Sequence, residues 1–369
     1  MKITRVRAVA YHKLQTTTPG WKISLGARRP HDTTSVIFVR VDTDEGLCGI
    51  GVSSPGLMVV SGETEAYHLD LIKNVLAPAI VGADPFEIES IHLSLDAAAA
   101  KAERAKAGID LALYDLMGKA LKVPANKLIG GVVNGSVRVT RLMGLYEPKE
   151  MAERTKAIVQ QGYSALKLKV GTTLEEDVER VQRVREAVGP GVIITIDFNQ
   201  ACTPKEAIER INKMEPFHLT LVEQPVRKED FKGMALVRRH VGPLIMADEC
   251  VNTPAEALRV IESGAADVIS LKFPKMGGLF KCRKVAAVCE AADIQYLVGT
   301  APGNRLSGAA NIHLAASLKG LTLPCELGEF ERYLNDPCSG LEIENGYLKP
   351  PEKPGLGVEI DLAEIGLAD

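Results

Sequence analysis

The segment "SALKLKVG", residues 164–171, places two lysines one residue apart within an apolar run. Strand side chains alternate between faces, so Lys167 and Lys169 point to one side and Leu166 and Leu168 to the other. Helix-like stretches precede and follow the run, which predicts a parallel strand covered on both faces. Such a strand brings two ammonium groups to its inner side, and burying them there requires either oppositely charged partners or a function.

The same unit, an apolar strand followed by an amphipathic helix, recurs from about residue 137 to about residue 330. Segments such as "EEDVERVQRVREAV" (175–188) and "PAEALRVIESG" (254–264) have helical spacing of apolar residues. Eight alternations predict an α/β fold, a modified (β/α)8 TIM barrel rather than an open sheet. The predicted strands are residues 138–144, 164–170, 192–198, 219–224, 244–249, 267–273, 294–299 and 322–327, with the last unit irregular.

The first 125 or so residues follow a different pattern. Residues 35–52, "SVIFVRVDTDEGLCGIGV", predict two strands joined by a turn at residues 44–46, and residues 105–122 predict a helix. Glycines in "NKLIGGVVNG" then mark a boundary. We therefore expect an N-terminal α+β capping domain over 1–125, the catalytic barrel over 126–330 and a segment over 331–369 that returns to the cap.

Composition narrows the class of protein. The net charge of −3 provides no basic field for nucleic acid, and no apolar run is long enough to span a membrane. The N-terminus lacks the apolar core of a secretory signal. Seven cysteines without a CxxC pair indicate buried thiols rather than a disulfide framework. We expect a cytoplasmic protein whose partner is a small molecule, with neither nucleic acid nor membrane as a partner.

Charged residues stand where the predicted strands end, which is where TIM barrels place their chemistry. Asp197, Glu223 and Asp248 end strands three, four and five, separated by 26 and 25 residues, about one βα unit each. Three carboxylates that converge on one part of the mouth repel each other unless a cation compensates them. Mg²⁺ suits these oxygen ligands and leaves positions for substrate, with Mn²⁺ as an alternative.

Lys272 ends strand six, four strands away from the strand that carries Lys167 and Lys169, so these lysines face each other across the mouth. A single strand-end carboxylate is more often a helix N-cap or a solvated loop residue, and a Lys-x-Lys pair can also mark a solvated edge strand. The combination of all these positions favours a catalytic site.

These motifs resemble the enolase superfamily, in its muconate-cycloisomerase (muconate lactonizing) subgroup. The mandelate-racemase branch would carry a histidine at the end of strand seven, where this chain has "YLVGTAPG" (296–303). The segments that carry the resemblance span nearly the whole chain: "GVSSPG" (51–56), "GIDLALYDLMGKAL" (108–121), "KLK" (167–169), "DFN" (197–199), "EQP" (223–225), "DE" (248–249) and "LKFPKMGG" (271–278).

The resemblance implies a Mg²⁺-dependent isomerase, either a cycloisomerase or a racemase/epimerase, that abstracts the proton α to a carboxylate through a metal-stabilised enediolate. It implies Asp197, Glu223 and Asp248 as metal ligands. It also implies Lys169 and Lys272 as the acid/base groups on opposite faces of the substrate, and a homo-oligomer in solution.

Other positions receive supporting roles from the resemblance. Lys167 is expected near the substrate, where it offsets carboxylate charge. Asn199 and Glu249 are expected beside the metal ligands, although exposure of Glu249 is an equal alternative. Lys275 is expected to be a solvated residue after strand six.

Substrate selection is assigned by the resemblance to two cap loops, residues 15–32 and 53–62. The first holds Trp21, Arg28 and Arg29, which could bind an extended or doubly anionic substrate or belong to an ordinary surface loop. On strand eight, "CELGEF" (325–330) lacks the Asp-x-Asp of many dipeptide epimerases, which argues against that activity. Glu326 and Glu329 could still bind a cationic group.

Three other functions stay open. A lyase such as a dehydratase would use the same intermediate. A Schiff-base aldolase would need one buried lysine and no group of three carboxylates, so magnesium dependence separates it from the isomerase. A catalytically inactive barrel would show no proton exchange into a carboxylate substrate.

Overall fold

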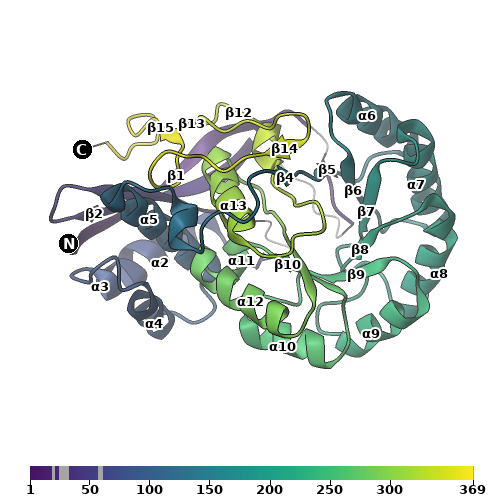
Figure 1. The fold of residues 1–369 in the computed structure, drawn as a ribbon, viewed down its shortest axis with the longest axis horizontal. Helices are drawn as coiled ribbons and strands as arrows, with labels where there is room; N and C mark the ends of the chain where they lie inside the picture. The colour runs from purple at the N-terminus through teal and green to yellow at the C-terminus, as the bar shows by residue number, and fades with distance from the viewer. Residues whose placement is uncertain (19–20, 25–32, 57–60, 369) are drawn as a thin grey trace.

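The computed structural model describes residues 1–18, 21–24, 33–56 and 61–368. Figure 1 shows a capping module that carries both chain termini beside a larger barrel. The cap sheet has the order β12-β1-β2-β3, with β1 at Ile3–Thr16, β2 at Thr33–Thr43, β3 at Cys48–Ser53 and β12 at Tyr333–Leu334. The predicted hairpin is confirmed as β2 and β3.

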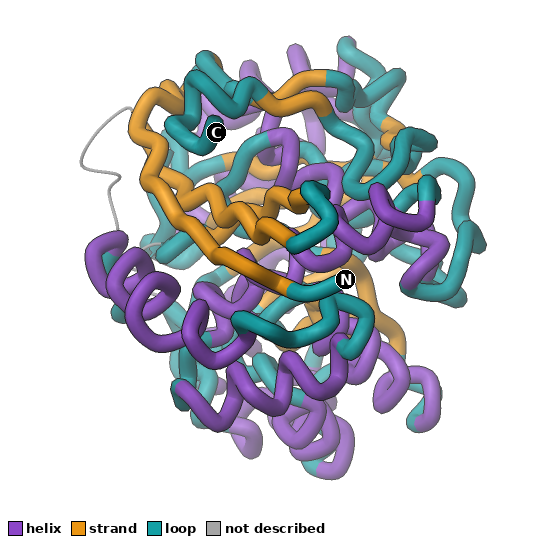
Figure 2. Tube along the Cα trace, turned by 90° about the vertical axis from the view of Figure 1, so that its left-hand side faces the viewer, coloured by secondary structure: helices purple, strands orange, loops and turns teal. Residues whose placement is uncertain are grey.

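The C-terminal part of the chain takes part in this cap sheet. β12 pairs antiparallel with the end of β1, through Gln15 with Leu334 and Thr16 with Tyr333. Figure 2, which looks onto the cap, shows the long strands with both termini nearby. β1 is a strand that the sequence analysis did not predict, because its apolar and charged residues do not alternate cleanly.

The predicted helix of the cap is confirmed as α5, Glu103–Leu121, which packs against β3. Glycines permit the close approach: a Cβ on Gly49 would come within 2.0 Å of Ala112 O, and one on Gly51 within 2.0 Å of Gly108 O. Helix α5 therefore packs against the face of β3 at which Gly49 and Gly51 lie. The other cap helices are α2 (Glu65–Leu71), η1 (Ile72–Leu76), α3 (Ala77–Ile80) and α4 (Ile88–Ala98).

The barrel sheet contains seven parallel strands in chain order. Each of the first seven predicted strands contains one of them. They are β5 (Arg141–Met143), β6 (Ala165–Lys169), β7 (Ile193–Asp197), β8 (Leu221–Glu223), β9 (Leu244–Ala247), β10 (Val268–Leu271) and β11 (Gln295–Val298).

The eighth position of the barrel is irregular, as predicted. Residues 325–327 form no regular strand, but Cys325 O accepts from Thr140 N at 2.7 Å and Glu326 N donates to Val298 O at 2.8 Å. This segment therefore bridges β11 to the start of the barrel and closes it. The fold is a modified (β/α)8 barrel with an α+β cap.

Helices surround the barrel and begin at its mouth. Thr203 and Thr253 cap two of them in reciprocal capping boxes with Glu206 and Glu256, which fixes the loops that follow the strand ends. The predicted helical segments are confirmed within α7 and α10. The helices are α6 (Pro148–Gln160), α7 (Leu174–Val188), α8 (Pro204–Met214), α9 (Phe231–His240), α10 (Pro254–Glu262), α11 (Phe273–Met276), α12 (Leu279–Ala291) and α13 (Arg305–Ser317).

Short elements complete the chain. They are η2 (Ala125–Leu128), β4 (Val137–Arg138), η3 (Glu215–Phe217), η4 (Glu329–Arg332), β13 (Cys338–Ser339), β14 (Tyr347–Leu348) and β15 (Glu359–Ile360). All seven cysteines are free, and all but Cys48 are buried. Within the described ranges, none of the helices has the length and apolarity to cross a membrane.

The cap and barrel meet along α5. Asp110 of this helix is fully buried and accepts a hydrogen bond from Leu279 N at 2.6 Å, at the start of α12. Its other oxygen lies 2.8 Å from His92 Nε2, and the His92 ring stacks on Phe280. These contacts of Asp110 and His92 anchor the start of α12 to the cap. The segment between β10 and α12, which contains α11, begins at Lys272.

Candidate active site

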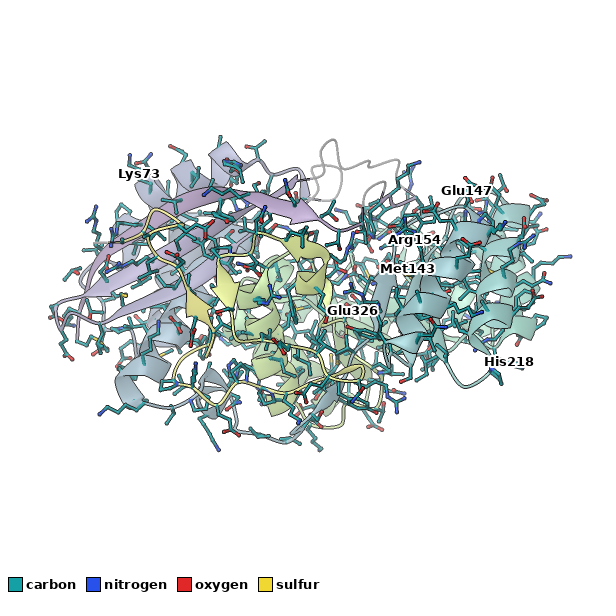
Figure 3. All side chains as sticks on the ribbon, turned by 90° about the horizontal axis from the view of Figure 1, so that it is seen from above. Lys73, Met143, Glu147, Arg154, His218 and Glu326 are labelled. Carbon is teal, nitrogen blue, oxygen red and sulfur yellow. The ribbon has the colours of Figure 1, made fainter. Side chains whose placement is uncertain are left out.

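A cavity of about 500 Å³ lies at the carboxyl ends of the barrel strands, where the cap covers them. In Figure 3, Glu326 lies near the middle of the molecule, between the cap helix that carries Lys73 and the far end of the barrel at His218. The charged and aromatic side chains of the cavity wall include Trp21, Glu63, Arg104, Lys167, Lys169, Asp248, Glu249, Lys272, Lys275 and Glu329.

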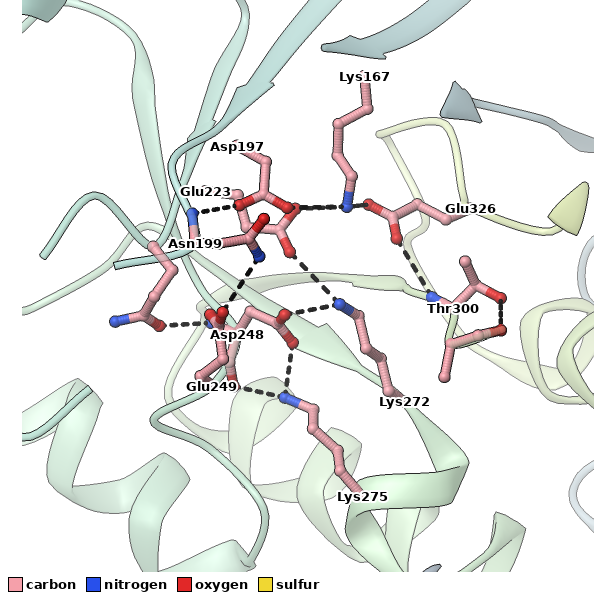
Figure 4. Close-up of polar contacts among 12 residues, drawn as sticks. Lys167, Asp197, Asn199, Glu223, Asp248, Glu249, Lys272, Lys275, Thr300 and Glu326 are labelled. Carbon is pink, nitrogen blue, oxygen red and sulfur yellow. Dashed lines mark hydrogen bonds and ion pairs between the residues drawn. The ribbon is translucent and has the colours of Figure 1, made fainter. Parts of the chain in front are cut away.

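Three carboxylates gather at adjacent strand ends. Asp197 ends β7, Glu223 ends β8 and Asp248 follows β9 directly. Asp197 and Glu223 are register partners in neighbouring strands, and both are fully buried. Figure 4 shows all three side chains directed toward the same space. Chain order places each one on the next strand, so the barrel itself assembles the group.

Lysines from opposite sides of the barrel contact these carboxylates. Lys169 Nζ, on β6, lies 2.5 Å from Asp197 Oδ2 and 2.8 Å from Asn199 Oδ1. Lys272 Nζ, after β10, lies 2.6 Å from Asp248 Oδ2 and 3.4 Å from Glu223 Oε1. Strands β7 to β9 stand between β6 and β10 in the sheet.

Lys167 is enclosed by acidic groups. Its Nζ lies 2.7 Å from Glu223 Oε2, 2.5 Å from Glu326 Oε1 and 3.6 Å from Asp197 Oδ2. Burial lowers the pKa of Lys167, but Glu223 and Glu326 outweigh that effect and raise it well above the ordinary value. Lys167 is thus a fixed internal cation. Glu326 also accepts from Thr300 N at 3.2 Å, so both of its oxygens are engaged.

The pKa values of Asp248, Glu223 and Lys272 are shifted by burial and by the neighbouring charges. Burial raises the pKa of Asp248, but Lys272 and Lys275 hold it well below its usual range. Burial and the charge of Asp197 raise the pKa of Glu223 well above its usual range. Burial lowers the pKa of Lys272, but Asp248 and Glu223 outweigh that effect and raise it.

Asn199 and Glu249 lie beside the carboxylates. Asn199 has a φ of 44° and donates its backbone N–H to Asp197 Oδ1 at 2.8 Å. Its Nδ2 donates to Glu249 Oε1 at 3.2 Å. Burial and the charge of Asp248 raise the pKa of Glu249 to about 7. Glu249 lines the cavity and is not a solvated surface residue.

The expectation for Lys275 was wrong. Its Nζ lies 2.9 Å from Asp248 Oδ1 and donates to Asp248 O at 2.5 Å, and its side chain is only 10% exposed. Lys275 lies three residues after Lys272 on the short α11, so the two ammonium groups approach Asp248 from one side. The Lys-x-x-Lys spacing was the signal for this arrangement.

Trp21 forms part of the cavity wall next to Lys169. Its ring centroid lies 6.0 Å from Lys169 Nζ and 4.6 Å from Arg332 Cζ. The ring packs so closely on Gly144 that a Cβ there would come within 2.5 Å of it. Arg332 in turn binds Glu329 at 2.8 Å. Arg28, like Arg29, lies outside the described residues.

The donor set suits a hard divalent cation. Glu249 Oε2 is a buried oxygen that accepts no hydrogen bond from the described residues, and Asp248 Oδ1 has only the ammonium of Lys275 beside it, at 2.9 Å. Within those residues, no three His, Cys, Asp or Glu side chains form a group that could hold a metal ion as they stand. Lysine ammonium groups lie among the carboxylates. The residues fit Mg²⁺ by chemistry, and here the lysines carry the compensating charge.

Comparison with known proteins decides the family. Residues 150–365 match the family model described as "Enolase C-terminal domain-like". Residues 7–130 match "Mandelate racemase / muconate lactonizing enzyme, N-terminal domain". The chain belongs to the enolase superfamily. Both parts of the fold are therefore those of this superfamily, as the resemblance implied.

Three curated relatives of this superfamily span most of the chain. It is 39% identical to a hydrophobic dipeptide epimerase of Enterococcus faecalis, covering 97% of this chain and 99% of the relative. It is 34% identical to an N-succinyl-L-Arg/Lys racemase of Bacillus cereus, over 98% and 96% of the two chains. It is 33% identical to muconate cycloisomerase 1 of Rhodococcus opacus, over 91% and 93%. The chain is an enolase-superfamily isomerase.

Solved structures of the superfamily agree with the fold. A dipeptide epimerase from Enterococcus faecalis, complexed with Mg and L-Leu-L-Tyr, has a TM-score of 0.92 and 36% identity, over 97% of this chain and all of that one. The N-succinyl Arg/Lys racemase from Bacillus cereus has a TM-score of 0.94 and 33% identity, over 99% and 97%.

Proposed function

We propose that the chain is a Mg²⁺-dependent racemase or epimerase that inverts the carbon α to a substrate carboxylate. The observation that carries the proposal is that Lys169 and Lys272 line one cavity from opposite strands, with the three carboxylates between them. Inversion needs one proton carrier on each face of the α-carbon, which is the arrangement of these lysines.

Each side chain has a part in this chemistry. Asp197, Glu223 and Asp248 would hold Mg²⁺, which supplies electrostatic stabilisation of the negative charge that develops on the substrate carboxylate. One lysine would take the α-proton as a neutral amine, because Mg²⁺ at the carboxylates would offset the negative charge of Asp248 and Glu223 that raises the pKa of Lys272. The ammonium of the other lysine would deliver a proton to the opposite face. Lys167 stays charged beneath them, because Glu223 and Glu326 enclose it.

The strand-eight residues bear on the substrate. Glu326 is bound by Lys167 and Thr300 N, and Glu329 is bound by Arg332. Both oxygens of Glu326 are thus engaged, so this carboxylate cannot receive the free ammonium of an amino acid or dipeptide without losing one of these partners. The racemase relative acts, by its name, on N-succinyl-L-Arg/Lys. We therefore propose N-acylated α-amino acids as the substrate class.

The test is proton NMR in deuterated water with each enantiomer of an N-succinyl amino acid. The wild type should exchange the α-proton and racemise the substrate. Lys169→Ala and Lys272→Ala should each stop racemisation but keep exchange with one enantiomer, a different one for each variant. Equal exchange of both enantiomers by both variants would contradict the opposed-lysine arrangement.

A cycloisomerase is the second candidate, because the chain is 33% identical to a muconate cycloisomerase and lacks the strand-eight Asp-x-Asp. In that case one lysine carries the proton, and loss of the other slows the reaction without selecting an enantiomer. A lyase would instead release a β-substituent, visible as a new product in the same spectra.

Domain division, metal choice, location and assembly are also proposed. The pairing of β12 with β1 supports the division into residues 1–125, 126–330 and 331–369. We propose that Mn²⁺ can replace Mg²⁺, since both accept oxygen ligands. We also propose a cytoplasmic location, on the composition, and a homo-oligomer, on the family resemblance, whose size light scattering would measure.

A further inference from the structure

The cap contributes an oppositely charged pair to the cavity that has no role so far. Arg104 lies in the first turn of α5 and Glu63 just before α2, and both line the cavity. Arg104 Nε lies 3.9 Å from Glu63 Oε2. Neither residue was singled out by the sequence analysis.

A buried network holds this pair in place. His68 is fully buried, with Nε2 2.7 Å from Glu63 Oε2 and Nδ1 3.0 Å from Ser53 Oγ. Ser53 Oγ also donates to the carbonyl oxygen of Arg104 at 2.9 Å. The end of β3, the start of α2 and the start of α5 are thereby tied together. Such prior ordering reduces the entropy that ligand binding costs.

Within the described residues, the Arg104 guanidinium has few hydrogen-bond partners. Arginine has five N–H donors. The described residues provide Arg104 with one hydrogen bond, to Ser54 O at 3.3 Å, and with the 3.9 Å pair to Glu63. Both contacts are long, although the side chain is only 13% exposed. A largely buried cation in this state is suited to an oxygen acceptor from a ligand.

The cap loop leaves room for the guanidinium. Gly56 has a φ of +72°, and a Cβ there would come within 2.9 Å of Arg104 Nη1. A glycine at this position of the "GVSSPG" motif therefore accommodates both the turn and the arginine.

We propose that Arg104, positioned by Glu63, His68 and Ser53, determines specificity by binding an oxygen acceptor on the acyl part of the substrate, away from the α-carboxylate. This rests on the proposed function, which supplies the N-acylated amino acid. The shared ligand chemistry is a planar sp² oxygen, of either a second carboxylate or the acyl carbonyl.

Equilibrium binding by calorimetry in the presence of Mg²⁺ tests the proposal without relying on turnover. The probes are N-succinyl-L-leucine, N-acetyl-L-leucine and L-leucine. The variants are Arg104→Met and Arg104→Lys, with Arg183→Met as the matched control. Arg183 is a half-exposed arginine of α7 whose partner, Glu179, lies on the same helix.

Arg104→Met should weaken N-succinyl-L-leucine binding by about tenfold to a hundredfold, and Arg104→Lys by less. Loss confined to that probe identifies a second carboxylate, and equal loss for both acylated probes identifies the acyl carbonyl. Arg183→Met should match the wild type.

Unchanged binding of N-succinyl-L-leucine by Arg104→Met, or an equal loss of affinity for all three probes, would overturn the proposal. If Arg104→Met does not fold, the binding affinities of Arg104→Lys decide. Arg104-dependent binding without α-proton exchange would leave this subsite standing and reject the racemase.

Discussion

At Glu223, one buried negative charge is compensated by two lysine ammonium groups. It has no exposed surface, and its two carboxylate oxygens lie beside Lys167 and Lys272. Removing one charge from such a buried set leaves the partner cations uncompensated. The effect on function should therefore far exceed the small change in volume.

Glu223→Gln should lower turnover by about a thousandfold or more, because it removes one of the three negative charges proposed to hold Mg²⁺. Turnover assays and magnesium calorimetry measure the loss, and circular dichroism shows whether the barrel stays folded. Full activity in this variant, or full wild-type activity with excess chelator, would disprove the three-carboxylate site.

Lys275 is the residue for which the structure differs most from the sequence-based expectation. Its ammonium contacts both Asp248 Oδ1 and the Asp248 carbonyl oxygen, so it orients a carboxylate at the cavity wall. Lys275→Met should reduce turnover by roughly tenfold to a hundredfold. Lys275→Arg should restore part of it. The exposed Lys232 of α9, changed to Met, is the control. Wild-type rates for Lys275→Met would show that the contact is dispensable.

At the scale of elements, close packing of α5 on β3 places the cap residues of the cavity. Gly51 of β3 and Gly108 of α5 meet without side chains between them. Two residues further along β3, Ser53 bonds to Arg104, which lies one helical turn before Gly108 on α5. The helix can approach because both surfaces are small. A side chain at this contact would push α5, and with it Arg104, away from β3.

Gly51→Ala should therefore lower the free energy of unfolding by about 1–3 kcal/mol, since its Cβ would come within 2.0 Å of Gly108 O. Gly191→Ala is the matched control, because nothing lies within 4 Å of the Cβ it would add. Urea unfolding of both variants measures the difference. Equal stability of the two would mean that α5 moves without cost.

Across the whole molecule, the C-terminal segment ties the barrel to the cap. Leu356 accepts a hydrogen bond at its carbonyl oxygen from His313 Nε2 of α13 at 3.2 Å, while its N–H donates to Asp115 of α5 at 2.9 Å. The segment therefore joins a barrel helix to the main cap helix. Burial lowers the pKa of His313 to about 4.

This shift predicts a pH dependence of stability. Between pH 6.5 and 4 the unfolded chain binds a proton at His313 that the folded chain does not, so stability falls as the pH falls through this range. From pH 7 to 5 the loss from this group is about 2 kcal/mol. His313→Asn should remove it in urea unfolding, whereas His240→Asn, at an exposed histidine, should not. An unchanged pH slope in His313→Asn would refute the assignment.

The sequence by itself determined the barrel, the hairpin of the cap and the strand ends that carry Asp197, Glu223, Asp248 and the lysines. These follow from local regularities: the period of side chains along a strand, the period along a helix and the length of one βα unit. Because parallel strands end at one mouth, chain order alone places these residues together.

Only the tertiary structure decided which groups touch. The enclosure of Lys167 by Glu326, the contact of Lys275 with Asp248, and the network from Ser53 to Arg104 join residues that no sequence period relates. β1 and the irregular eighth strand likewise depend on partners supplied by distant segments. The physical reason is that these contacts result from closure of the barrel and docking of the cap, which set distances between residues far apart in the chain.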